Sequence, residues 1–377
     1  MKWKLLILLI TVILVNSCGI AYADTIDELT DTVDQTLDGL DFSDIDSVAG
    51  DFIDSVYDKI QQIINGQFDS AESFWNIFWE LLGSSLSNVS AAVVSVGIIM
   101  IILGLVKNTS DGLIGKSTQT VISFVGVCLI VSSIVSLLAD VYASVFSLMD
   151  KLASLSQASF PIMLTLLVAN GGNAVSTVCQ PSMVIFSSFV IELVKNVILP
   201  FSVSSMIFVA VSSISRNIRL NKTASTIQSI STWLLGIVFM FFSAFTTVQG
   251  IGASTIDSVS FRAAKFAAKN YVPILGGYLA EGFDMVVAST TLVKNSFGIV
   301  CVLAIFLMII NPLSTILATN LSVQILTSVC EPIVDEKYVT MLSKLSKCLS
   351  FLGVLVIAVA FMFCILLFIC ISCCNMV

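Results

Sequence analysis

Long apolar runs dominate the chain, and several of them are nearly free of charge. With their flanks they supply roughly the 20 residues that a helix needs to cross about 30 Å of hydrocarbon. These runs are Leu86–Val106, Thr118–Ala139, Ile230–Val248, Phe297–Ile310 with its flanks, and Leu349–Ile371. The pattern predicts an all-α, polytopic integral membrane protein of about 6–8 transmembrane helices with re-entrant or interfacial segments.

A further apolar stretch, from Ser182 to Ile214, is interrupted by Glu192, Lys195 and Pro200. It is too long for one upright helix, so we expect either two spans or one kinked and tilted helix. Glu192 and Lys195 stand three residues apart, and charges inside an apolar run require pairing or a wet cavity. They are either the polar lining of a conduit or an ion pair near a helix end.

Three other segments are apolar but poor candidates for spanning a bilayer. Half-length or broken segments are typical of re-entrant or interfacial elements. They are the short run Phe160–Ala169, which leads into Asn170, Gly171, Gly172 and Asn173; the amphipathic segment Ile256–Asn270, with Arg262, Lys265 and Lys269 in one stripe; and the run Asn311–Val329, which carries Asn320 and Gln324. The Asn-Gly-Gly-Asn sequence is either a filter-like turn or a surface loop.

The region after the basic stripe also holds the acids Glu281 and Asp284. A basic amphipathic helix suits anionic headgroups, another subunit or an acidic segment. Together with Asn170–Asn173, Glu192 and Lys195, the basic stripe and these two acids are the candidate conduit or assembly residues.

The amino terminus predicts a cleavable signal peptide over residues 1–23. Lys2 and Lys4 precede an apolar region, and Ala21-Tyr22-Ala23 forms a small-x-small cleavage site. A lipoprotein-type leader ending at Cys18 is the alternative. Lysines at 107, 116 and 222 and arginines at 216 and 219 mark two cytoplasmic loops. Simple counting then puts the basic stripe outside, against the positive-inside rule, so the orientation of residues 251–291 stays open.

Residues 24–80 form an acidic head with apolar residues three or four apart, which predicts an amphipathic helical region broken near Gly39 and Gly50. The head carries 15 acidic residues and one basic residue. Its aspartates lack the register of an EF-hand loop, so a solvated acidic face is expected. The leader places this head outside the cytoplasm, and residues 81–377 form the polytopic membrane domain.

Composition excludes several kinds of chemistry. Hydrophobic residues make up 57% of the 377 residues and charged residues 11%, with a net charge of −8 and no histidine. Histidine-dependent catalysis and histidine-ligated metals are therefore ruled out. With no strongly basic face and no catalytic pair in view, we expect no enzyme activity, no cofactor, no metal and no nucleic acid partner.

Two stretches resemble the stage III sporulation protein AE family: FPIMLTLLVANGGNAVSTVCQP from Phe160 to Pro181, and VQGIGASTIDSVSFRAAKFAAKNYVPILGGYLAEGFDMV from Val248 to Val286. The resemblance covers nearly the whole chain, from a cleavable leader through a variable polar head to the polytopic body, although the acidic head does not match position by position. It implies a permease-like component of a channel or secretion-like complex, required for endospore development, in the mother-cell membrane around the forespore.

The implied partners are other membrane proteins of the stage III sporulation A operon and, across the intermembrane space, stage II sporulation protein Q. Membrane lipid and an oligomeric complex are implied as well. Two alternatives remain open: a stand-alone secondary transporter or permease, and a structural membrane scaffold.

Overall fold

The computed structural model describes residues 26–50, 55–64, 71–113, 116–169, 173–214, 220–252 and 276–372. These ranges form helices and short turns, with no strand among them. The leader and the basic stripe at 262–269 lie outside the described residues. The all-α architecture is confirmed.

The acidic head folds as three short helices, and the first two end at Gly39 and Gly50 as predicted. Helix α2 spans Ile26–Asp38, α3 spans Ser43–Ala49 and α4 spans Val56–Ile64. Gly39 and Gly50 both lie in turns that follow a helix. Apolar positions of the predicted stripe are buried, including Val33, Leu37, Ile45, Val56, Ile60 and Ile63. The amphipathic pattern is therefore confirmed in the described part of the head.

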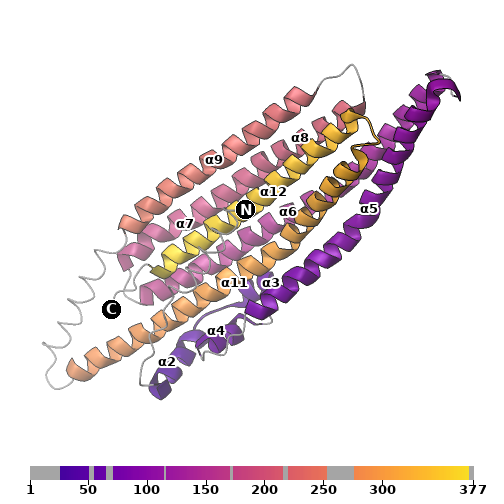
Figure 1. Cartoon of the computed structure of the whole chain (residues 1–377). Coiled ribbons are helices and arrows are strands. Elements are labelled where there is room, and N and C mark those ends of the chain that lie inside the picture. The colour runs from indigo at the N-terminus through magenta and orange to yellow at the C-terminus, as the bar shows by residue number, and fades with distance from the viewer. Residues whose placement is uncertain are drawn as a thin grey trace.

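The body is a bundle of long helices that run back and forth along one axis (Figure 1). Within the described ranges, six helices are long and apolar enough to cross a membrane. Their bounds are α5 Ala71–Leu113, α6 Lys116–Ala169, α7 Asn173–Leu193 continuing through η1 Val194–Ile198 into α8 Leu199–Ile214, α9 Asn221–Gly252, α11 Gly276–Cys330 and α12 Glu336–Ser372. Helix α5 runs unbroken across the expected boundary between residues 80 and 81.

The segment from Ser182 to Ile214 forms one continuous helix, so the single-helix alternative is confirmed and the two-span alternative is wrong. Its regular α-helical geometry is interrupted by a π-helical turn, in which the N–H of Leu199 donates to the carbonyl of Val194. Pro200 follows at once, and proline removes one backbone donor and crowds the carbonyl four residues earlier. A wider turn at this point relieves the crowding, as π-bulges do within α-helices.

Two of the short elements expected from the sequence do not exist as separate elements. Phe160–Ala169 is the last part of α6, and Asn311–Val329 lies inside α11. Both helices continue through a proline, Pro161 or Pro312. Thr165 donates a hydrogen bond of 2.9 Å to the carbonyl of Pro161, and Thr315 donates one of 3.0 Å to that of Asn311. Each hydroxyl bonds the carbonyl four residues earlier, as threonines inside helices commonly do.

Helices α11 and α12 form the centre of the bundle. Leu355, Val356 and Val359 on α12 are fully buried, and α12 packs against α11, α8, α9 and α6. In the head, α2 and α4 pack on α11, while α3 packs on α6. The rings of Phe42 and Phe297 lie 5.7 Å apart between head and body. The head is therefore docked along the bundle.

A polar cluster joins α11 to α12 through the two residues that made 311–329 look like a poor span. Asn320 Nδ2 donates to Ser350 Oγ at 3.0 Å, and Gln324 Nε2 donates to Ser346 Oγ at 3.0 Å. Ser346 Oγ in turn donates to Asn320 Oδ1 at 2.6 Å. Hydrogen bonds between membrane helices stabilise by about 0.6–2 kcal/mol each. The polar residues thus fasten the central helix pair.

Replacing Asn320 with leucine should lower the apparent melting temperature of the purified protein in detergent. The change removes two hydrogen bonds to α12 and leaves Ser346 without its acceptor, for a loss of about 1–2 kcal/mol. The matched control is Leu321→Asn, because Leu321 is exposed on the next position of α11. Equal melting temperatures for Asn320→Leu and the unchanged protein would contradict a fastening role.

Candidate functional site

A charged seam lies on the outside of the bundle where α6 meets η1. Lys195 Nζ forms an ion pair with Asp150 Oδ1. Its ammonium also lies over the ring of Phe146, 4.3 Å from the centroid. The side chain of Asp150 is 51% exposed and that of Lys195 is 20% exposed. The aromatic ring and the carboxylate together hold the cation on the bundle surface.

Glu192 does not pair with Lys195, although the spacing suggested it. Asn196 Nδ2 donates to Glu192 Oε2 instead. The two charged residues stand on either side of the start of η1, and a π turn changes the angle between successive side chains. Lys195 therefore points to α6. Lys195 thus has the ion pair expected of a charge in an apolar run, and its partner is Asp150, 45 residues earlier in the sequence.

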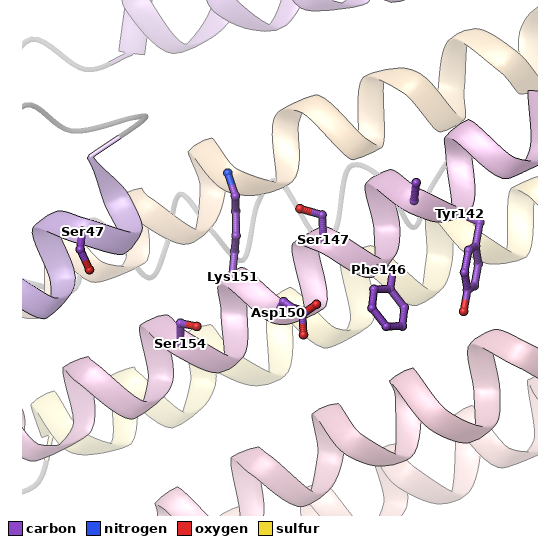
Figure 2. Close-up of a pocket in the computed structure, with 8 residues that line it drawn as sticks. Ser47, Tyr142, Phe146, Ser147, Asp150, Lys151 and Ser154 are labelled. Atoms are coloured by element: carbon purple, nitrogen blue, oxygen red, sulfur yellow. The ribbon is translucent and has the colours of Figure 1, made fainter.

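Beside the seam is a groove of about 710 Å³. Figure 2 shows its lining residues following one another along α6, with Ser47 on α3 close by. The lining combines hydroxyl groups, charges and two aromatic rings: Ser47, Tyr142, Ala143, Phe146, Ser147, Asp150, Lys151 and Ser154. Such a surface suits water or a polar protein segment better than lipid tails.

A second unusual cation lies deeper in the body. Lys294 on α11 is fully buried, three residues before the Phe297 ring that Phe42 contacts. Burial of a lysine in an apolar bundle is costly unless polar groups surround it. Lys294 therefore lies one helical turn from the α11 residue that the head contacts.

The acidic side chains of the head create a negative electrostatic potential around Tyr57. Burial raises the pKa of Tyr57, and the carboxylates of Asp38, Asp34 and Asp58 raise it further. Gln61 Nε2 donates to Asp34 Oδ1 at 3.1 Å and so joins α4 to α2. One of the acidic residues, Asp34, therefore also links two helices of the head.

The carboxylate of Asp41 accepts a hydrogen bond at the start of α3. Ser43 bonds its carboxylate, with a backbone N–H distance of 3.0 Å, and these bonds lower the pKa of Asp41. Because the folded pKa is lowered, this contribution to stability is present above the unfolded pKa and is lost as pH falls through the folded one.

The structure brings together only some of the residues that the sequence singled out. Glu192 and Lys195 lie at the seam, and Asp284 is exposed on α11. Asn173 begins α7, and Glu281 lies within α11. Outside the described residues are Asn170, Gly171, Gly172, Arg262, Lys265 and Lys269.

Sequence reasoning missed three residues of these sites: Asp150, Phe146 and Lys294. A signal existed for the two charged ones, because Asp150 interrupts the apolar sequence of α6 and Lys294 interrupts that of α11. No local signal joins Phe146 to Lys195. Within the described ranges, no three Cys, Asp or Glu side chains converge as a metal ion would require.

The fold and the seam define a class: a multi-pass, all-α membrane protein, with six candidate spans among the described residues, a docked acidic head and a charged outer face. The family model for stage III sporulation protein AE matches residues 55–374, and the chain belongs to that family. A similar protein is stage III sporulation protein AE of Bacillus subtilis (strain 168), 23% identical over 352 residues, which are 91% of this chain and 87% of that protein. No solved structure matches the chain. Family membership supports a role in sporulation.

Proposed function

We propose that this chain is a non-enzymatic membrane component of a channel or secretion-like complex that links the mother cell to the forespore. It would sit in the mother-cell membrane around the forespore, with the acidic head in the intermembrane space. Its partners would be other stage III sporulation A-operon proteins and stage II sporulation protein Q. Family membership supports the sporulation role, and the apolar helices support the membrane location.

The charged seam is the structural observation that supports a conduit. The side chain of Asp150 is half exposed on the outer face of the bundle, and lipid tails are a poor solvent for a carboxylate. Water or a polar protein surface is therefore needed beside α6. We place the path along this face, between this chain and its neighbours in the complex.

The acidic head fits the same arrangement. Asp34, Asp38 and Asp58 raise the pKa of Tyr57 together, and such a field attracts a basic protein surface. Because the head is docked on α11 and α6, a partner bound to it would be held next to the groove of Figure 2.

Charge substitutions at the seam test the proposal in a spore-forming host. Asp150→Lys should reduce heat-resistant spores by about tenfold or more, because it sets two cations side by side. The exchange Asp150→Lys with Lys195→Asp restores an opposite pair and should recover most of the loss. Immunoblots of membranes would confirm equal protein levels.

The control is Lys222→Asp, which reverses an exposed cation on α9, away from the seam. We expect it to leave spore counts unchanged. If Asp150→Lys sporulates normally at equal protein level, the seam has no part in a conduit, and a structural scaffold becomes the better description. Solute flux through the purified chain alone in liposomes would instead favour a stand-alone transporter.

A further inference from the structure

Two opposite edges of the bundle carry large apolar side chains that stay exposed among the residues that the structure describes. Helix α5 lies at one edge and α9 at the other, with α11 and α12 between them (Figure 1). Ile98, in the middle of the apolar part of α5, is 54% exposed, and Met240, in the middle of that of α9, is 71% exposed. Both faces therefore need an apolar environment.

The heights of these two faces along the bundle axis can be compared through the central helices. Gln324 on α11 bonds Ser346 on α12, and Asn320 bonds Ser350. Leu326 is therefore level with about Lys344 of α12. A Cβ on Gly97 of α5 would meet Leu326 Cδ1 at 2.8 Å, so α5 at Gly97 is level with the same part of α12.

The height of α9 relative to α12 is fixed by the contacts of the buried Ser205 on α8. Ser205 Oγ on α8 donates to the carbonyl of Ala224 at 2.9 Å and lies 3.7 Å from Cys348 Sγ. Ala224, near the start of α9, is therefore level with Cys348 of α12. Since α9 and α12 run in the same direction (Figure 1), Met240 is level with about Cys364.

On this common scale Ile98 and Met240 are about 30 Å apart along the bundle axis, at 1.5 Å per residue. That separation equals the whole thickness of a hydrocarbon core, about 30 Å. If the bundle stood upright, a bilayer centred on one apolar face would leave the other outside. Consistent with this, α5 projects well beyond the turn that joins α11 to α12 (Figure 1).

Charged residues show the same offset. Lys107 and Lys116 flank the α5–α6 turn, whereas the exposed Lys222 and Lys347 are level with the middle of the apolar part of α5. An upright bilayer around α5 would place both of these exposed lysines in hydrocarbon, which costs several kcal/mol each by insertion scales.

We propose that the lipid belt runs obliquely around the bundle, from residues 86–106 and 118–139 on α5 and α6 to residues 230–248 on α9. The outer faces of α5 and α9 are separated by about 35 Å, taking three interhelix spacings and the side chains. The offset then corresponds to an inclination of roughly 40°, the upper end of the range for membrane helices. Both apolar faces contact lipid, Lys222 reaches water on the same side as Lys107, and the long side chain of Lys347 extends toward that water.

Depth measurements in proteoliposomes test the belt. Single cysteines replace Ile98 and Met240, and each is labelled with a bimane fluorophore. Because both side chains are exposed, the substitutions leave the packing intact. The unsubstituted protein, labelled in parallel, supplies the background signal. Lipids brominated near the end of the acyl chain are expected to quench both labels strongly, and the two efficiencies should agree within about twofold.

Lys222→Cys and Asp284→Cys, at exposed positions beyond the two edges of the belt, serve as aqueous controls and should react with a charged thiol reagent. The proposal is overturned if either Ile98→Cys or Met240→Cys reacts with that reagent as the controls do, because the bundle then stands upright. It is also overturned if the Met240 label is reached by neither brominated lipid nor the charged reagent. In that case protein, and not lipid, covers α9.

Discussion

Replacing Gly104 with alanine should destabilise the protein by about 1–3 kcal/mol, whereas alanine is normally the better helix residue. A Cβ at this position would lie 2.5 Å from the carbonyl oxygen of Ile333 and 3.1 Å from its Cγ2. The closest atom belongs to the backbone of the turn after α11, so no side-chain rotation relieves the clash. Helix α5 or the turn must move, and the packing between α5 and α11 loosens.

Gly83 provides the matched control, because a Cβ there has no atom within 4 Å and the residue lies on the same helix. Gly83→Ala should leave stability unchanged or raise it by up to about 1 kcal/mol. Size-exclusion profiles after heating in detergent would rank the three proteins. A Gly104→Ala protein as heat-resistant as Gly83→Ala would show that α5 does not pack closely on this turn.

Replacing Ile60 with aspartate should release the head from the body. Ile60 is fully buried on α4, the helix that packs on α11. Placing a carboxylate there costs several kcal/mol, about 3–5, because the site is apolar and the head is already acidic. The long helices have their own core, so the body should stay folded while the head becomes sensitive to protease.

The comparison is Gln35→Asp, which adds the same charge at an exposed position of α2. In proteoliposomes, limited proteolysis should cut the head of Ile60→Asp at least about tenfold faster than that of Gln35→Asp, which follows from a free-energy difference above 1.4 kcal/mol. Equal cleavage rates would mean that the head is not held by burial of its apolar stripe.

The local features were predictable because each depends on neighbouring residues. The apolar runs predicted helices that cross a membrane, and the spacing of Val33, Leu37 and Ile45 predicted an amphipathic head. Gly39 and Gly50 predicted where its helices end. Pro200 and the two charges before it predicted a local interruption of the long apolar helix. Each of these patterns extends over a few turns of one helix, where periodicity and backbone chemistry act.

The lengths of α6 and α11 were not predictable in the same way. The short run after Phe160 looked like half a span because Asp150, Lys151 and several serines precede it. Those polar residues lie on the seam and the groove, where the helix continues past polar groups without ending. A change of solvent along a helix gives the same sequence pattern as a break in it.

The sequence by itself determined the helical class, the membrane environment, the acidic head and the family. Only the tertiary structure decided that Lys195 pairs with Asp150, that Lys294 is buried, and that the apolar faces of α5 and α9 lie at different heights. These three features depend on which helices are neighbours and at what register. Register is fixed by close contacts such as Gly97 with Leu326 and Ser205 with Ala224, between residues far apart in the chain, and periodicity within one helix carries no information about them.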